Sequence, residues 1–282
     1  MNEETQSFAE WVGRSERSED YIAPAPAQAA AATLDDTATI FGPEDELPPL
    51  WHWFYFLPKA PQSRIGPDGH PQRGGFLPPI PLPRRMFAGA RLAFHAPLRI
   101  GRTAQRIGTI RSISQKTGRS GTLAFVTVGY AISQEGRLCI EEEQDIVYRE
   151  PGAAVAAPQP ASLPPLPENA WSRLITPDPV LLFRFSALTF NGHRIHYDRP
   201  YAMNEEGYPG LVVHGPLTAV LLIELLRRHA GRPVARFTFR GEAPLFDLAP
   251  FRVMAAAEGD AVTLAAHGPD GRKAMTATAT LS

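Results

Sequence analysis

The chain has little cysteine, little net charge and no long uninterrupted apolar run. Cys139 is the only cysteine among 282 residues, which excludes an internal disulfide framework and favours a reducing, cytoplasmic compartment. The most apolar stretch, residues 211–226, is too short to cross a bilayer, and the acidic first residues do not resemble a signal peptide. The formal net charge of -1 gives no electrostatic footprint for a nucleic acid or an anionic membrane.

Proline, in contrast, is abundant, and its 29 residues cluster. Residues 22–33 are of low complexity and predict a mobile connector. Residues 57–83 show almost no periodicity, and an irregular excursion of this length is typical of a functional lid or a partner surface. The predicted division of the chain is an N-terminal helix and connector, a first half, a linker and a second half, at residues 1–46, 47–150, 151–170 and 171–282.

Hydrophobic periodicity predicts the main elements. Residues 4–18 are compatible with a short amphipathic helix, and alternating β-branched residues between 91 and 148 predict four antiparallel strands. Residues 179–190 are predicted as a strand, and residues 216–229 as a helix that is apolar on nearly all sides and therefore buried. Three or four further strands follow this helix.

An apolar helix wrapped by an antiparallel sheet predicts an α+β hot-dog fold, and two such halves would make a double hot dog. Pro216 in the first turn of the predicted helix and Gly231 just after its end are the expected boundary residues. The first half has only residues 47–57 as a candidate helix, so its repeat is predicted to be degenerate.

The segment 190–217 carries the groups that are suited to chemistry. Proton-transfer side chains lie close together in it and are followed by the start of the buried helix, whose N–H groups stabilise negative charge. This combination favours acid/base chemistry on a substrate that develops an oxyanion. The residues concerned are Asn191, His193, His196, Asp198, His214 and Gly215.

Segment 183–217 resembles the active-site segment of the MaoC-like hydratases and dehydratases, whose pattern ends in H-x-D-x-x-[FY]-A and continues to a helix-opening H-G. The tail is matched by His196, Asp198, Tyr201 and Ala202, and the H-G pair by His214 and Gly215.

Two positions depart from the general pattern. Asn191 stands where that family has an aspartate, and His193 where it has an asparagine. This variant, together with LPPLWHWFYFLP and LPRRMFAGARLAF in the first half, resembles the subgroup of mesaconyl-C4-CoA hydratases and mitochondrial 3-hydroxyacyl-thioester dehydratases type 2. The resemblance extends over about residues 47–282.

The resemblance implies a cofactor-independent hydro-lyase that adds or removes water across the α,β double bond of an acyl-CoA thioester. The most concrete substrate is mesaconyl-C4-CoA (3-methylfumaryl-CoA), hydrated to citramalyl-CoA. The alternatives are a general (3R)-3-hydroxyacyl-thioester dehydratase of fatty-acid synthesis, a non-catalytic acyl-thioester-binding subunit and, less favoured, a hot-dog thioesterase. The expected assembly is a cytoplasmic homodimer in which CoA enters only as part of the substrate.

The chemistry of the side chains predicts their roles. His196 is the expected base, because an imidazole titrates near neutrality. Asn191 can orient the water through its amide, and the Gly215 N–H can donate to the thioester oxygen. The second proton carrier is predicted to be His193, with Asp198 as the second choice.

The expected binding residues are Tyr201 and His214 in the motif, and arginines that hold the CoA phosphates or a substrate carboxylate. A zinc site made by His193, His196 and His214 is disfavoured, because the segment lacks cysteines and a flanking carboxylate pattern. The candidate arginines are Arg84, Arg85, Arg194 and Arg240.

Overall fold

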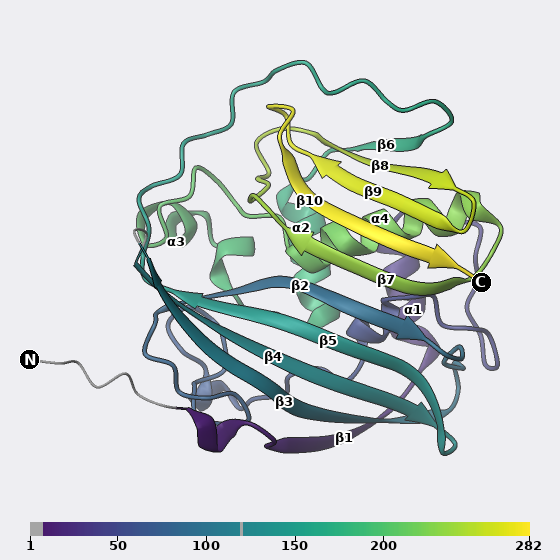
Figure 1. The fold of residues 1–282 in the computed structure, drawn as a ribbon, viewed down its shortest axis with the longest axis horizontal. Coiled ribbons are helices and arrows are strands. Elements are labelled where there is room, and N and C mark those ends of the chain that lie inside the picture. Colours follow the sequence, from purple (N-terminus) through teal and green to yellow (C-terminus); the bar gives the residue numbers. More distant parts are fainter. Residues whose placement is uncertain (1–7, 119–120) are drawn as a thin grey trace, which may run out of the picture.

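The computed structural model describes residues 8–118 and 121–282. Within these ranges the strands form one antiparallel sheet in the order β1-β3-β4-β5-β2-β7-β10-β9-β8-β6 (Figure 1). The strands are β1 (Ser15–Tyr21), β2 (Arg84–Phe94), β3 (Thr103–Gly118), β4 (Gly121–Gln134), β5 (Arg137–Arg149), β6 (Trp171–Ile175), β7 (Val234–Gly241), β8 (Phe251–Glu258), β9 (Ala261–His267) and β10 (Lys273–Leu281).

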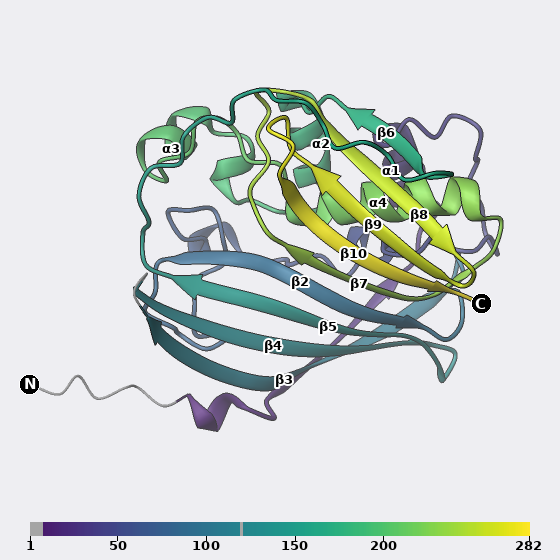
Figure 2. The same cartoon turned by 45° about the horizontal axis from the view of Figure 1, so that its top comes forward.

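The helix α4 (Gly215–Ala230) lies against the sheet of the second half (Figure 2). Every residue from Leu217 to Leu226 is buried, because the helix contacts strands of the second half and also β2 of the first. None of the helices among the described residues is long and apolar enough to cross a membrane. The other helical segments are α1 (Pro24–Thr33), α2 (Pro179–Thr189), α3 (Arg199–Asn204), η1 (Ala9–Trp11), η2 (Trp51–Phe54), η3 (Gln62–Arg64) and η4 (Arg194–His196).

The two halves of the sheet join where β2 pairs with β7. Gly89 lies opposite Arg240 and Ala93 opposite Arg236, and a register shift precedes Gly89 in the pairing of β2 with β5. A side chain at Gly89 would place its Cβ 2.3 Å from the Phe239 carbonyl oxygen, so the close approach of the strands requires glycine. The double hot-dog fold is confirmed, with the two expected sheets continuous across this joint. The division of the chain at residues 151–170 stays a prediction.

The predictions for the central helix and the strands of the first half are confirmed. Helix α4 covers the predicted residues 216–229, and β2 to β5 cover the strands predicted between residues 91 and 148. The strand predicted at 179–190 is wrong, because these residues form α2. The Asp178 side chain accepts a hydrogen bond from the Leu181 N–H at 2.7 Å, Pro179 begins the helix, and Phe190 ends it in the left-handed conformation.

The N-terminal segment also differs from its prediction. Residues 4–7 lie outside the described residues, and the rest of the predicted helix 4–18 forms η1 and the edge strand β1. The expected mobile connector at 22–33 is largely the helix α1, whose small buried side chains, among them Ala27 and Ala30, allow it to pack closely on α2. The candidate helix at 47–57 contains only the short η2.

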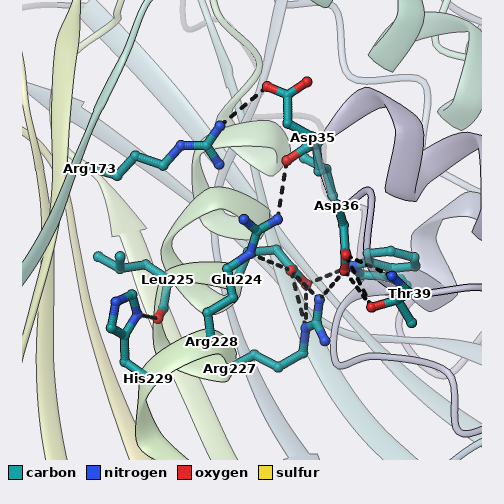
Figure 3. Close-up of polar contacts among 11 residues, drawn as sticks. Asp35, Asp36, Thr39, Arg173, Glu224, Leu225, Arg227, Arg228 and His229 are labelled. Atoms are coloured by element: carbon teal, nitrogen blue, oxygen red, sulfur yellow. Dashed lines mark hydrogen bonds and ion pairs between the residues drawn. The ribbon is translucent and has the colours of Figure 1, made fainter.

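A buried ionic network ties the C-terminal end of α4 to the N-terminal region. Glu224 accepts hydrogen bonds from the Trp51 indole at 3.0 Å and from the Arg227 guanidinium. Figure 3 shows Arg227 between the carboxylates of Glu224 and Asp36, with an N–O distance of 2.9 Å to Asp36. The buried Glu224 carboxylate is therefore compensated by a cation, and its partners come from widely separated parts of the chain.

Candidate active site

The candidate catalytic motif begins with a turn formed by Asn191. The Asn191 N–H donates to the Ser186 carbonyl at 2.8 Å, and its side-chain oxygen accepts from the His193 N–H at 3.0 Å. This side-chain-to-backbone bond is the usual way in which asparagine forms a turn after a helix. It places His193 at the start of η4 and His196 at its end.

The buried His196 has a defined tautomer. Its Nδ1 lies 2.7 Å from the Val212 carbonyl oxygen, which can only accept, so Nδ1 carries the proton and Nε2 keeps its lone pair. Burial holds the pKa of His196 well below its ordinary value, and the charges of His214 and His193 lower it further. The imidazole is therefore neutral near pH 7, as a general base must be.

His214 lies between His196 and the N-terminus of α4. Its ring stacks on that of His196 with centroids 3.6 Å apart, and its Nε2 is 2.9 Å from the Ser186 hydroxyl oxygen. Burial, followed by the charge of His193, lowers the pKa of His214 to about 3. Its buried Nδ1 has no hydrogen-bond partner within the described parts of the chain.

Gly215 is the first residue of α4 and directly follows His214. An added Cβ at Gly215 would meet only the Phe87 carbonyl oxygen, at 3.8 Å. The start of a long helix carries a partial positive charge, and its first N–H groups have no partner inside the helix. The predicted helix start is confirmed, whereas the orientation of Gly215 N–H and His196 toward one cavity stays a prediction.

His193 lies between His196 and a carboxylate that the sequence analysis missed. Its ring is nearly perpendicular to that of His196, with centroids 5.4 Å apart, and its Nε2 is 3.7 Å from Glu206 Oε1. Burial raises the pKa of Glu206, but His193 and Arg84 outweigh burial and hold it below its ordinary value. Glu206 is therefore an ionised, buried carboxylate beside the second candidate proton carrier. In the sequence it is only one acidic residue of a turn.

The proline-rich loop 57–83 contributes a second histidine–carboxylate pair. His70 Nδ1 is 3.0 Å from Asp68 Oδ2, and the His70 ring lies 4.2 Å from that of His193. Burial, followed by the charge of Arg85, lowers the pKa of His70 to about 3. Neither Asp68 nor His70 was predicted, and the only signal for them was polar residues inside a long irregular segment.

The backbone of this loop rests directly on the motif. Gly69 has a φ of +91°, and a Cβ there would lie 1.7 Å from the Gly192 carbonyl oxygen. The Arg194 N–H also donates to the Asp68 carbonyl oxygen at 2.9 Å. Only glycine satisfies both the left-handed conformation and this contact. The loop is therefore part of the wall around the histidines.

Several predicted residues are occupied by contacts that shape the motif. Asp198 accepts from the Tyr201 N–H at 3.1 Å, which caps α3, and from the Arg194 guanidinium at 2.8 Å. Arg194 also donates to the Pro67 carbonyl oxygen at 3.0 Å and lies 4.1 Å above the Tyr201 ring. The Tyr201 hydroxyl points to Glu206 at 3.4 Å. Asp198 thus acts as the N-cap of α3, a role that is common for aspartate.

The remaining arginines differ in their surroundings. Arg84 and Arg85 begin β2, and Arg84 Nε is 3.3 Å from Glu206 Oε2. Arg85 is half-buried and pairs with Tyr148 across β2 and β5. Arg240 is exposed on β7 and forms no ion pair with any residue the structure describes. Of the four candidate arginines, only Arg84 therefore contacts Glu206, the carboxylate beside His193.

The metal-binding geometry differs from the set considered in the sequence. Among the described residues, the ligand atoms of His193, His196 and His214 do not form a group that could hold a metal ion. The ligand atoms of Asp68, His70 and His193 all lie within 4.8 Å of one another. In the structure Asp68 and His70 are hydrogen-bonded to each other, and the expectation of no resident metal stays a prediction.

Solved structures with a similar fold support the architecture. HtdX of Mycobacterium tuberculosis superposes with a TM-score of 0.67 at 19% identity, covering 94% of this chain and 99% of that one. A MaoC-like dehydratase gives a TM-score of 0.71 at 14% identity, covering 98% and 99%. A second M. tuberculosis protein, described as a double hotdog, gives 0.59 at 14% identity, with 96% of each chain covered. These likenesses establish the double hot-dog fold.

Sequence comparisons establish the family. The family of hydroxyacyl-thioester dehydratases type 2 matches residues 50–247, and the chain belongs to it. The chain is 66% identical to mesaconyl-C(4)-CoA hydratase of Chloroflexus aurantiacus over 271 residues, 96% of each protein. It is 27% identical to the mitochondrial hydroxyacyl-thioester dehydratase type 2 of Schizosaccharomyces pombe over 272 residues, 86% of this chain and 90% of the relative. The predicted resemblance and the enzyme class, a hydro-lyase, are confirmed.

Proposed function

We propose that the enzyme reversibly hydrates mesaconyl-C4-CoA (3-methylfumaryl-CoA) to citramalyl-CoA. The identity of 66% to a hydratase named for this substrate, over nearly the full length of both chains, supports the choice of substrate. The observation that carries the mechanism is the neutral His196, whose ring stacks on that of His214, the residue directly before α4. A base beside a site for negative charge is what addition of water to an unsaturated thioester needs.

In the proposed mechanism His196 Nε2 takes a proton from water while the water oxygen bonds to the β-carbon. The π electrons of the double bond move toward the thioester, which becomes an enolate. The Gly215 N–H and the α4 dipole stabilise the developing charge on its oxygen. The α-carbon then takes a proton from the second proton carrier, and exchange with solvent restores both histidines.

His193 is the proposed second proton carrier. Its Nε2 lies 3.7 Å from Oε1 of the ionised Glu206, so a carboxylate adjoins the ring that would carry the proton. Its ring adjoins that of His196, so the two groups can act on neighbouring carbons of one substrate. Asp198 already holds Arg194 and caps α3, so we assign it a structural role. The Asn191 side-chain oxygen holds the His193 backbone, which leaves its amide N–H groups to orient water.

The proposal extends to the cofactor requirement, the CoA-binding arginines, the oligomeric state and the compartment. The chemistry uses only protein side chains and backbone, so the enzyme needs no cofactor beyond the CoA of its substrate. Arg85 and Arg240 supply the positive charge proposed for CoA phosphates, because neither forms an ion pair with a residue that the structure describes, whereas Arg194 is paired with Asp198. We further propose that the enzyme is a homodimer of the cytoplasm.

A panel of enoyl-CoA substrates tests this function. Hydration is monitored as the loss of the enoyl-thioester absorbance, and the products are identified by mass spectrometry. Mesaconyl-C4-CoA is expected to have the highest kcat/KM, and lengthening the acyl chain is expected to give no gain. Preference for long, uncharged chains would instead indicate the general 3-hydroxyacyl-thioester dehydratase. Saturable CoA-ester binding without turnover would indicate a binding subunit, and release of free CoA would indicate a thioesterase.

A further inference from the structure

Arg84 has hydrogen-bonding capacity that its protein surroundings do not use. It is the first residue of β2, and its side chain is only 10% exposed. Its Nε lies 3.3 Å from Glu206 Oε2, whereas its buried Nη1 has no partner within the described parts of the chain. A guanidinium carries five N–H donors, and a buried donor without an acceptor is costly. Arg84 is therefore suited to a further anionic partner.

Glu206 links this guanidinium to His193. One oxygen of its carboxylate faces Arg84, and the other lies 3.7 Å from His193 Nε2. The Glu206 charge is shared by Arg84, His193 and the Tyr201 hydroxyl, so it does not consume the whole of the Arg84 charge. Arg84 is thus linked through this one carboxylate to His193, the proposed second proton carrier.

The proposed substrate carries an anion in the corresponding position. In 3-methylfumaryl-CoA the β-carbon, which receives the hydroxyl group, bears both a methyl group and a free carboxylate. This carboxylate is one bond from a reacting carbon, so its partner has to lie beside the histidines rather than at the distant CoA phosphates. Arg194 is less suitable, because Asp198 and the Pro67 carbonyl already occupy its donors.

We propose that Arg84 binds the free carboxylate of the substrate through Nη1 and so determines specificity for monothioesters of dicarboxylic acids. This inference rests on the proposed function. The N-terminal half then selects the substrate, while the C-terminal half supplies the proposed base and second proton carrier. A planar guanidinium suits this task, because it can bind Glu206 and a second carboxylate along different edges.

The test compares two substrates that differ only in the carboxylate. Mesaconyl-C4-CoA and 3-methylcrotonyl-CoA, which has a methyl group in its place, are assayed with the wild type, Arg84→Gln and Arg84→Lys. The ratio of their kcat/KM values is expected to fall roughly 100-fold in Arg84→Gln, because a buried charged pair is lost. A decrease of about tenfold or more is expected in Arg84→Lys, which keeps the charge but not the fork.

Arg91→Gln is the matched control. Arg91 lies on the same strand, but its side chain is 45% exposed and is paired with Glu143 and Asp145. Its variant should keep the wild-type ratio. Suppose that Arg84→Lys melts at the wild-type temperature and its ratio of kcat/KM values stays within about threefold of the wild-type ratio. That result would overturn the proposal, because a bidentate guanidinium–carboxylate contact contributes more than threefold. Arg84→Lys decides the matter even if Arg84→Gln is unstable. A wild type that hydrates neither substrate would refute the proposed function instead.

Discussion

Replacing His196 by asparagine separates its proposed chemical role from its structural one. The asparagine amide can occupy the place of imidazole Nδ1 and donate to the Val212 carbonyl, which His196 contacts at 2.7 Å. It offers nothing in place of the basic Nε2. We therefore expect kcat to fall by about 100- to 10,000-fold, the usual contribution of a general base.

The effect on folding stability should be much smaller. The substitution loses the ring stack with His214, whose centroid is 3.6 Å away, and such pairs contribute about 0.5–1.5 kcal/mol. His196→Ala should lose a similar amount of activity and destabilise the fold by a further ~1–3 kcal/mol, because it leaves the buried Val212 carbonyl without its donor.

The assays are initial hydration rates at saturating mesaconyl-C4-CoA and urea unfolding of the same samples. An asparagine variant that keeps more than about a third of the wild-type kcat would refute the base assignment, since a general base contributes far more. Equal stability of the two variants would show that the contact with Val212 contributes little.

Three further perturbations test neighbouring parts of the site. His193→Asn should reduce kcat by about 100-fold or more in the hydration assay, and near-normal turnover would remove His193 as the proton carrier. Gly69→Ala should lower the melting temperature and the activity together, because its Cβ would lie 1.7 Å from the Gly192 carbonyl; an unchanged enzyme would show that the loop can move away. The folded pKa of His214, about 3, lies below its ordinary 6.5, so the unfolded chain binds that proton more readily. His214 should therefore stabilise the fold above pH 6.5 and lose this contribution as the pH falls toward 3; His214→Asn should unfold with a weaker pH dependence over that range, and an identical dependence would contradict the assignment.

The parts of the fold that were predicted correctly have local signals. Helix α4 has apolar residues all round, a proline in its first turn and a glycine after its end, and each signal acts within a few residues. The segment 179–190 has sequence signals for a strand and also for a helix. Its Val, Leu and Phe residues favour a strand, but Asp178 and Pro179 are a helix start, and in the structure the helix start prevails.

The candidate site was predicted where its residues are contiguous and missed where they come from elsewhere. His193 and His196 are separated by one turn of η4, so their proximity follows from sequence spacing. His70 reaches His193 only because Gly69 packs against Gly192, a contact that no local pattern encodes. Glu206 was likewise missed, because its role depends on Arg84, which lies in the other half of the chain.

Strand β2 shows how the first half contributes to the site even though it has no long central helix among the described residues. At one end it carries Arg84, farther along the Phe87 carbonyl faces Gly215, and Gly89 then allows the joint with β7. The first half has only the short η2 where a central helix was expected, yet its strand β2 forms a wall of the site in the second half. A substitution along β2 should therefore disturb the site directly, although the proposed base lies in the other half of the chain.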